Sequence, residues 1–117
     1  MPNRSQVRST TLDAVFQALA DPTRRAVVER LLRGPASTSE LARPFGMALP
    51  SFAEHLERLE RSGIVKSTKD GRVRTYRIES RTLNEASHWL DAQRVLWTAR
   101  LDRLDAVVLA MKRKEER

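Results

Sequence analysis

The stretch STSELARPFGMALPSFAEHLERLERSG, residues 37–63, decides the fold. Ser37 and Glu40 have the spacing of a capping box, which predicts a short helix that runs through Phe45 and ends at Gly46. Pro50 is typical of a first helical turn, so we expect a second helix from there to the end of the stretch. Two short helices joined by a few residues predict a helix-turn-helix, the motif that presents its second helix to the major groove of DNA.

Two further helices are predicted upstream of this stretch. Residues 12–19 carry apolar side chains at helical spacing, which should bury one face of a first helix. Asp21 and Pro22 then supply an N-cap and a first helical residue for a second helix, which we expect to end at Gly34.

A β-hairpin is predicted downstream. Residues 64–68 and 73–78 have the composition of strands, and they flank Lys-Asp-Gly-Arg, a strong signal for a two-residue turn. A hairpin after a helix-turn-helix is a wing. Basic residues are concentrated on it, which suggests contact with phosphates or with the minor groove: Lys66, Lys69, Arg72, Arg74 and Arg77.

A long helix is predicted over residues 82–111, which contain no Gly or Pro. Apolar side chains recur there at every seventh residue, and at 1.5 Å per residue such a helix is longer than a small domain can cover. We therefore expect a second copy of the chain to cover part of the stripe in a homodimer. The alternative is a helix that folds back on its own core.

The expected fold class is mainly α with a small β-hairpin (α+β), a winged helix-turn-helix with the element order ααααββα. The expected organisation is one domain over residues 11–111. A flexible basic arm, residues 1–10, should precede it, and a mobile charged tail, residues 112–117, should follow.

Composition excludes several classes of function. The chain has 22 Lys and Arg against 15 Asp and Glu, a net charge of +7 that favours a polyanionic partner such as nucleic acid. It has no cysteine, which excludes disulfides and thiolate metal ligands. We find no signal sequence, no membrane span and no nucleophile paired with a base, so we expect a cytoplasmic protein that is not an enzyme.

Several strings of the sequence resemble ArsR/SmtB-type repressors over residues 11–110. They are ALADPTRR (18–25), SELA (39–42), LPSFAEHL (49–56), SGIV (62–65) and GRVRTY (71–76). The resemblance implies a winged-helix dimer, joined by its first and last helices, that binds an inverted-repeat operator and is released by an effector. Together with the apolar stripe, it predicts a dimer interface that contains Leu12, Phe16, Leu83, Leu90, Trp97, Leu101, Leu104 and Val108.

The chain departs from the metal-sensing members of that family. They carry a Cys-x-Cys motif after Glu-Leu, where this chain reads Glu-Leu-Ala-Arg-Pro. Of the Asp and His ligands that other members place on the last helix, only His88 and Asp91 are found, although two such residues per chain could form four ligands across a dimer axis. We expect no metal and no cofactor, as in the metal-independent branch.

The predicted recognition helix places four polar residues opposite its apolar stripe: Ser51, Glu54, Arg58 and Arg61. Glu54 and Glu57 have the i,i+4 spacing for ion pairs with Arg58 and Arg61, which would make this a solvated face. Alternatively, Glu54 accepts a hydrogen bond from a cytosine amino group. By resemblance, His55 is expected at the DNA backbone.

Two neighbouring arginines near the start of the second helix, Arg24 and Arg25, also allow two interpretations. They could contact phosphate, or they could be solvated or cap a helix.

Three classes of function are compatible with the sequence. The first is a sequence-specific DNA-binding repressor that binds double-stranded operator DNA as a homodimer. The second is a sequence-tolerant architectural DNA-binding protein, and the third is a winged-helix module for protein interactions. The helix-turn-helix, the basic hairpin and the long last helix together favour the repressor, whose effector the sequence does not identify.

Overall fold

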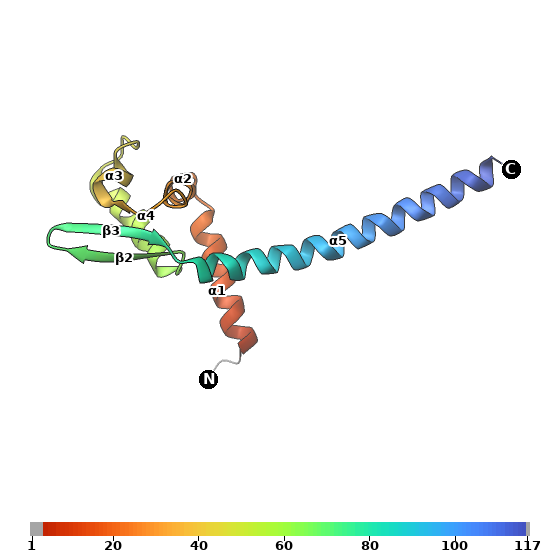
Figure 1. Cartoon of the computed structure of the whole chain (residues 1–117), viewed down its shortest axis with the longest axis horizontal. Coiled ribbons are helices and arrows are strands. Elements are labelled where there is room, and N and C mark those ends of the chain that lie inside the picture. Colours follow the sequence, from red (N-terminus) through yellow and green to blue (C-terminus); the bar gives the residue numbers. More distant parts are fainter. Residues whose placement is uncertain (1–3, 117) are drawn as a thin grey trace. The chain divides into compact units, whose positions relative to one another are not determined.

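The computed structural model describes residues 4–116, with side chains described for residues 11–116. This part of the chain forms helices and strands in the order ααβααββα (Figure 1). The chain divides into two compact units, Met1–Glu85 and Ala86–Arg117. Residues 1–3 of the expected arm and residue 117 of the expected tail lie outside the described residues.

The first unit is a small helical core with a sheet at one edge. Helices α1 (Arg4–Leu19), α2 (Pro22–Leu31), α3 (Thr38–Ala42) and α4 (Leu49–Arg61) provide most of it. Each helix contributes apolar side chains from one face, as their periodicity predicts. The largest fully buried side chains are Val15, Val27, Leu41, Phe52, Leu56, Leu59, Ile64 and Val65.

Helix α1 begins at Arg4, so the backbone of residues 4–10 is helical where we expected an arm. The physical reason is that no Gly or Pro interrupts the chain between Pro2 and the break at Asp21. The capping predictions for the next two helices are confirmed. The side chain of Asp21 accepts a 3.0 Å hydrogen bond from the backbone N–H of Arg24, and Ser37 and Glu40 form the reciprocal capping box of α3.

Helix α3 is shorter than expected and ends at Ala42. Pro44 has no backbone N–H and its ring crowds the preceding turn, so the helix stops before it reaches Gly46. Phe45 therefore lies in the connection between α3 and α4. Its ring packs against Phe52 with the ring centroids 5.4 Å apart, which joins the two helices of the motif.

The hairpin consists of β2 (Val65–Asp70) and β3 (Val73–Ile78). Asp70 pairs with Val73, so the two turn residues are Gly71 and Arg72, one position later than Asp-Gly suggests. Gly71 has a φ of 61°, which a two-residue hairpin turn requires at its first position and which glycine adopts without strain.

A third strand, β1 (Ala36–Ser37), was not predicted. It pairs with β3 through Ala36 and Tyr76, so the sheet has the strand order β1-β3-β2 and the expected element order lacked one strand. Two residues are too few to show the alternating pattern that identifies a strand in a sequence.

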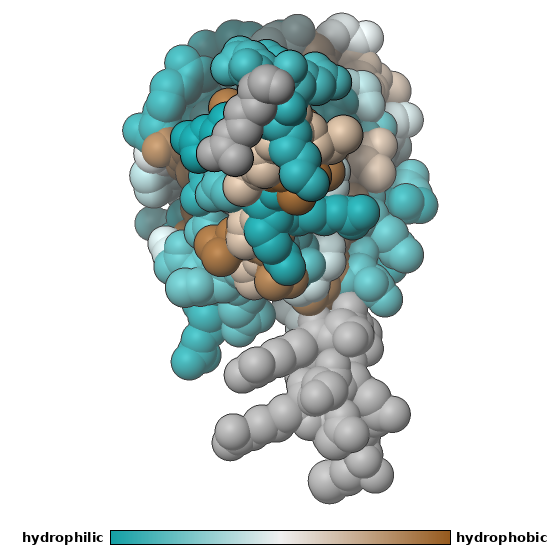
Figure 2. Space-filling view, turned by 90° about the vertical axis from the view of Figure 1, so that its right-hand side faces the viewer, coloured by the Kyte–Doolittle hydropathy of each residue, from teal (hydrophilic) through white to brown (hydrophobic). Residues whose placement is uncertain are grey.

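Helix α5 (Ser80–Glu115) crosses the division between the units and forms most of the second unit. It is longer than the expected 82–111. No Gly or Pro marks the division, and residues 112–115 of the expected tail are helical. Figure 2 shows hydrophobic residues, in brown, at the molecular surface between hydrophilic residues, in teal. The large exposed apolar residues of α5 are Trp89, Leu90, Val95, Leu96, Trp97, Leu101, Leu104, Val107, Val108, Leu109 and Met111. Among the described helices, none has the length and apolar character needed to cross a membrane.

Candidate nucleic-acid interface

Helix α4 has one buried face and one exposed face. Phe52, Leu56 and Leu59 are buried in the core of the first unit, which fixes the rotation of the helix about its axis. The opposite face is exposed and carries the four polar residues that the helical wheel places there, Ser51, Glu54, Arg58 and Arg61. A packed helix with a polar outer face is the arrangement that a recognition helix needs.

Both i,i+4 ion pairs expected on α4 are present. A guanidinium nitrogen of Arg58 lies 3.7 Å from a carboxylate oxygen of Glu54, and the corresponding distance between Arg61 and Glu57 is 3.0 Å. Exposed pairs of this kind contribute between zero and about 1 kcal/mol. The arginines can therefore exchange these partners for a base or a phosphate at little cost.

His55 lies at the border of the exposed face and is half-buried. Its Nδ1 lies 3.1 Å from Nη1 of Arg24 and 3.7 Å from Oδ2 of Asp21. His55 therefore connects the middle of α4 with the beginning of α2. Its expected contact with the DNA backbone stays a prediction.

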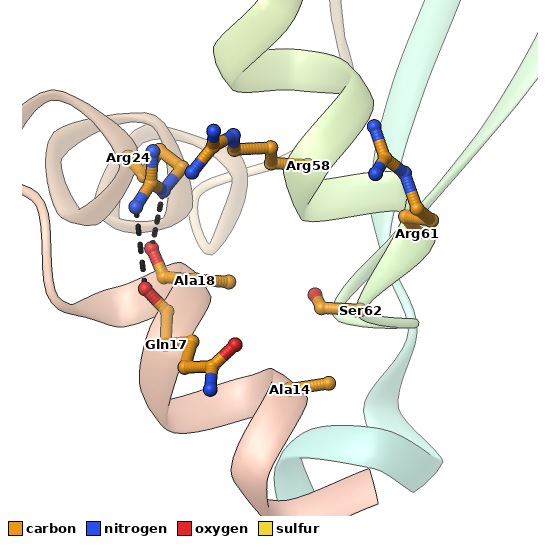
Figure 3. Close-up of a pocket in the computed structure, with 7 residues that line it drawn as sticks. All are labelled: Ala14, Gln17, Ala18, Arg24, Arg58, Arg61 and Ser62. Atoms are coloured by element: carbon orange, nitrogen blue, oxygen red, sulfur yellow. Dashed lines mark hydrogen bonds between the residues drawn. The ribbon is translucent and has the colours of Figure 1, made fainter. Parts of the chain in front are cut away.

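Arg24 is buried, with only 8% of its surface exposed. Its Nε donates a 2.6 Å hydrogen bond to the carbonyl of Ala18, and its Nη2 donates a 3.2 Å bond to the carbonyl of Gln17 (Figure 3). These carbonyls belong to the last turn of α1, where carbonyl groups run out of helical partners, and that of Gln17 also accepts a 3.2 Å hydrogen bond from the backbone N–H of Ala20. The capping role of Arg24 is confirmed, and Arg25 adds a 2.8 Å bond to the carbonyl of Leu19.

A pocket of about 200 Å³ lies between α1, α2 and the end of α4. Gln17, Ala14 and Ala18 line it on the α1 side, and Ser62 lies opposite them (Figure 3). The remaining lining residues are Arg24, Arg58 and Arg61, so no carboxylate lines the pocket. Three guanidinium groups thus meet at this pocket beside α4, and two of them, Arg58 and Arg61, are paired with the exposed carboxylates of Glu54 and Glu57.

The five basic residues of the hairpin are all exposed. The register pairs Lys69 with Arg74 and Lys66 with Arg77. Cross-strand partners share a face and neighbouring residues alternate, so the two pairs lie on opposite faces of the hairpin. Lys69 and Arg74 share the face of the buried Tyr76, while Arg72 lies in the turn.

Two of these basic residues already have partners within the protomer. Nζ of Lys66 lies 2.8 Å from Oε2 of Glu79, and this contact is the main reason that the pKa of Glu79 is below its ordinary value. Nη1 of Arg74 donates a 2.8 Å bond to Oγ of Ser67, which donates a 2.7 Å bond to Glu60 of α4. In the described part of the chain, the other three basic residues form no ion pair: Lys69, Arg72 and Arg77.

His88 and Asp91, the two candidate metal ligands of the sequence, lie one turn apart on α5. Within residues 11–116 there is no group of three or more His, Cys, Asp or Glu side chains that could hold a metal ion. A carboxylate oxygen of Asp91 lies 3.1 Å from Arg94, one turn along α5.

The residues expected at a dimer interface differ in exposure within the protomer. Leu12 and Leu83, both in the first unit, are half-buried. The others are exposed: Phe16 in the first unit, and Leu90, Trp97, Leu101, Leu104 and Val108 in the second.

Comparison with known proteins places this geometry among regulators of transcription. Residues 19–68 match the family model described as a helix-turn-helix domain. The HTH-type transcriptional regulator Rv2034 of Mycobacterium tuberculosis is 42% identical over 67 residues, which are 57% of this chain and 63% of that protein. The transcriptional repressor SdpR of Bacillus subtilis is 27% identical over 79 residues, which are 68% of this chain and 88% of that protein.

A solved structure agrees over a larger part of the chain. The crystal structure of an ArsR family transcriptional regulator is 56% identical in sequence and superposes with a TM-score of 0.72. The match covers 75% of this chain and 97% of that one.

Proposed function

The chain belongs to the ArsR family of helix-turn-helix transcriptional regulators, and from this we propose that it is a repressor that binds an inverted-repeat operator as a homodimer. The observation that carries the proposal is the exposed polar face of α4, held outward by the buried Phe52, Leu56 and Leu59. Such a helix fits the major groove, while the basic hairpin reaches the phosphates or the minor groove beside it.

In this proposal α4 reads bases with Ser51, Glu54 and Arg58. The pair between Glu54 and Arg58 is long, at 3.7 Å, and exposed, so base contacts can replace it. Arg58 then donates to the acceptor edge of guanine, and Glu54 accepts from the amino group of cytosine. The hairpin and His55 contact the DNA backbone, which adds affinity without sequence preference.

The homodimer is supported by the exposed apolar side chains of α5. Trp97, Leu101 and Leu104 recur on one face of this helix, and each is exposed in the protomer. Apolar surface of this extent on a water-soluble regulator marks an interaction site, and a second copy of the same helix provides a complementary surface. Phe16 of α1 belongs to the same proposed interface.

We further propose that the protein acts in the cytoplasm, where bacterial operators are found, and without a metal. The support for the second statement is the sequence, which lacks cysteine and has only two histidines. Chelators should leave DNA affinity unchanged. Stoichiometric zinc binding that abolishes DNA binding in the wild type, and that His88→Ala removes, would place the protein among the metal sensors.

Selection from a pool of random duplexes tests the proposed function. The wild type should enrich an inverted repeat with half-sites about 10 base pairs apart, or a multiple of that. Glu54→Ala and Arg58→Ala should alter the enriched bases, each at a cost of about 1 to 3 kcal/mol in discrimination. Arg100→Ala, an exposed arginine on α5, is the matched control and should leave the selected sequence unchanged.

The same selection separates the other two classes of function. Tight DNA binding without an enriched sequence would identify an architectural protein. Absence of DNA binding at physiological salt would identify a protein-interaction module.

A further inference from the structure

The contact between Arg24 and His55 determines which ring nitrogen of His55 carries the proton. A guanidinium group has only donors and keeps its charge in proteins. Nη1 of Arg24 lies 3.1 Å from Nδ1 of His55, so Nδ1 must accept the hydrogen bond with its lone pair. In the neutral ring the proton is then on Nε2.

The competing partner of Nδ1 would give the opposite tautomer. Oδ2 of Asp21 could accept a hydrogen bond from a protonated Nδ1, but it lies 3.7 Å away, beyond hydrogen-bond distance. The same oxygen already accepts the backbone N–H of Arg24 at 3.0 Å. The distances therefore favour Arg24 as the partner of Nδ1.

The other ring nitrogen is accessible to solvent. The side chain of His55 is 22% exposed, and Nε2 forms no hydrogen bond with a described residue. Among the described residues, no fully buried side-chain nitrogen or oxygen lacks a partner, so Nε2 cannot be fully enclosed. Its neighbours one turn away on α4, Ser51 and Arg58, belong to the exposed polar face.

We propose that Arg24 is a positioning residue of the DNA interface, which holds His55 as the Nε2–H tautomer so that this N–H donates to a phosphate oxygen of the DNA backbone. The DNA step rests on the function proposed above, whereas the tautomer is a property of the free protein. Arg24 is itself held by the carbonyls of Gln17 and Ala18, so the direction of the imidazole is set from the end of α1. The donor is thus oriented before DNA arrives, which reduces the entropic cost of the contact.

Long-range ¹H–¹⁵N NMR of the histidine rings in the free wild-type protein tests the tautomer directly. The chain has two histidines, so His88→Gln leaves the signals of His55 alone. For the neutral ring we expect Nδ1 of His55 to resonate as a nitrogen without hydrogen and Nε2 as one that carries hydrogen. A proton on Nδ1 would overturn the proposal whether or not the protein binds DNA.

Arg24→Met tests the source of this preference, because it removes the donors and keeps a chain of similar length. The ring nitrogens of His55 should then shift toward the average of the two tautomers. An unchanged Nε2–H tautomer in folded Arg24→Met would show that Arg24 does not set it.

Two substitutions of His55 test the DNA contact without altering Arg24, and they apply even if Arg24→Met does not fold. The amide of Gln reaches the place of Nε2, whereas the shorter Asn places its amide near Nδ1 and leaves Nε2 empty. His55→Asn should weaken binding to a short random-sequence duplex by about tenfold, and His55→Gln should retain most of the affinity.

The loss in His55→Asn should be the same factor on an operator obtained by selection, because phosphate contacts carry no sequence information. Wild-type affinity in His55→Asn would overturn the proposed phosphate contact. If the wild-type protein itself binds no duplex, the proposed function is wrong. The NMR experiments would still decide whether Arg24 sets the tautomer of His55.

Discussion

Nζ of Lys66 lies 2.8 Å from Oε2 of Glu79, which neutralises one of the five basic residues of the hairpin within the protomer. Arg72 has no such partner in the described part of the chain and lies in the turn. The unpaired positive charge of the hairpin therefore includes Arg72 in the turn and excludes Lys66.

Removing the Lys66–Glu79 pair should leave the salt dependence of DNA binding unchanged. The double variant Lys66→Met/Glu79→Gln keeps the net charge, because it removes one charge of each sign. Arg72→Met should instead reduce the slope of log K against log salt by about one unit, as expected for one lost phosphate contact. Equal slope changes in both variants, measured by titration at several salt concentrations, would mean that Lys66 leaves Glu79 for a phosphate.

Ser67→Ala should weaken DNA binding without changing its salt slope. Ser67 accepts a hydrogen bond from Arg74 and donates one to Glu60, so its hydroxyl orients the guanidinium relative to α4. Both bonds involve a charged group, but solvent screens them at this exposed site, so we expect a contribution of about 1 kcal/mol, which corresponds to a roughly fivefold loss of affinity. Thr68→Ala removes a hydroxyl from the other face of the hairpin and should have little effect. The orienting role would be wrong if both variants bound equally well.

Leu101→Glu should convert the homodimer into monomers without unfolding the first unit. Leu101 is 42% exposed in the protomer, so its replacement leaves no cavity in the core. In the dimer, the new carboxylate would be buried without a partner, which costs several kcal/mol. Ala99→Glu adds the same charge on the opposite side of α5 and should remain dimeric. Analytical ultracentrifugation distinguishes these outcomes, and a wild-type monomer at micromolar concentration would contradict the proposed interface.

Acid should destabilise the fold partly through Asp21. The hydrogen bond from the backbone N–H of Arg24 is the main cause that holds the pKa of Asp21 below its ordinary value. In the acid range, Asp21 therefore binds protons more readily in the unfolded chain than in the folded one. Its contribution to the free energy of unfolding is fully present above the ordinary carboxyl pKa, and it is lost as the pH falls through the pKa of Asp21 in the folded protein.

Asp21→Asn keeps an N-cap and removes this titration, so its stability in urea should depend less on pH than that of the wild type. Some acid sensitivity should remain, because backbone hydrogen bonding at Ser37 lowers the pKa of Glu40, and Lys66 lowers the pKa of Glu79. Glu29→Gln, an exposed carboxylate of α2, is the control. Identical pH profiles for wild type and Asp21→Asn would contradict the assigned role.

The helix-turn-helix and the hairpin could be predicted because local signals define them. Capping residues, prolines and apolar spacing mark where α2, α3 and α4 begin and which face is buried, and these predictions are confirmed. The differences in helix length also have local causes. Pro44 shortens α3, and the absence of Gly and Pro extends α1 and α5.

The role of Arg24 could not be predicted in full, because its three partners lie elsewhere in the sequence. Two are carbonyls of the preceding helix, which any residue type could supply, and the third is the ring of His55, 31 positions away. Such a contact depends on how α1, α2 and α4 pack, and periodicity in one sequence does not contain that information. The DNA-contacting roles of the α4 and hairpin residues stay predictions.

Ser37 has two structural roles, since it is the last residue of β1 and the N-cap of α3. Its backbone pairs with Thr75 of β3, so the start of the helix-turn-helix is attached to the middle of the hairpin strand. At the other end of the motif, Ser67 attaches β2 to α4 through Glu60. The two elements proposed to contact DNA are thus linked at both ends.

Because of this double attachment, the proposed contacts of α4 with the bases and of the hairpin with the DNA backbone should lie a fixed distance apart on the operator. Operators recognised by this protein should vary in base identity but keep the spacing within each half-site. One inserted base pair there shifts the second contact by about 3.4 Å along the axis, a displacement that the doubly attached hairpin cannot follow.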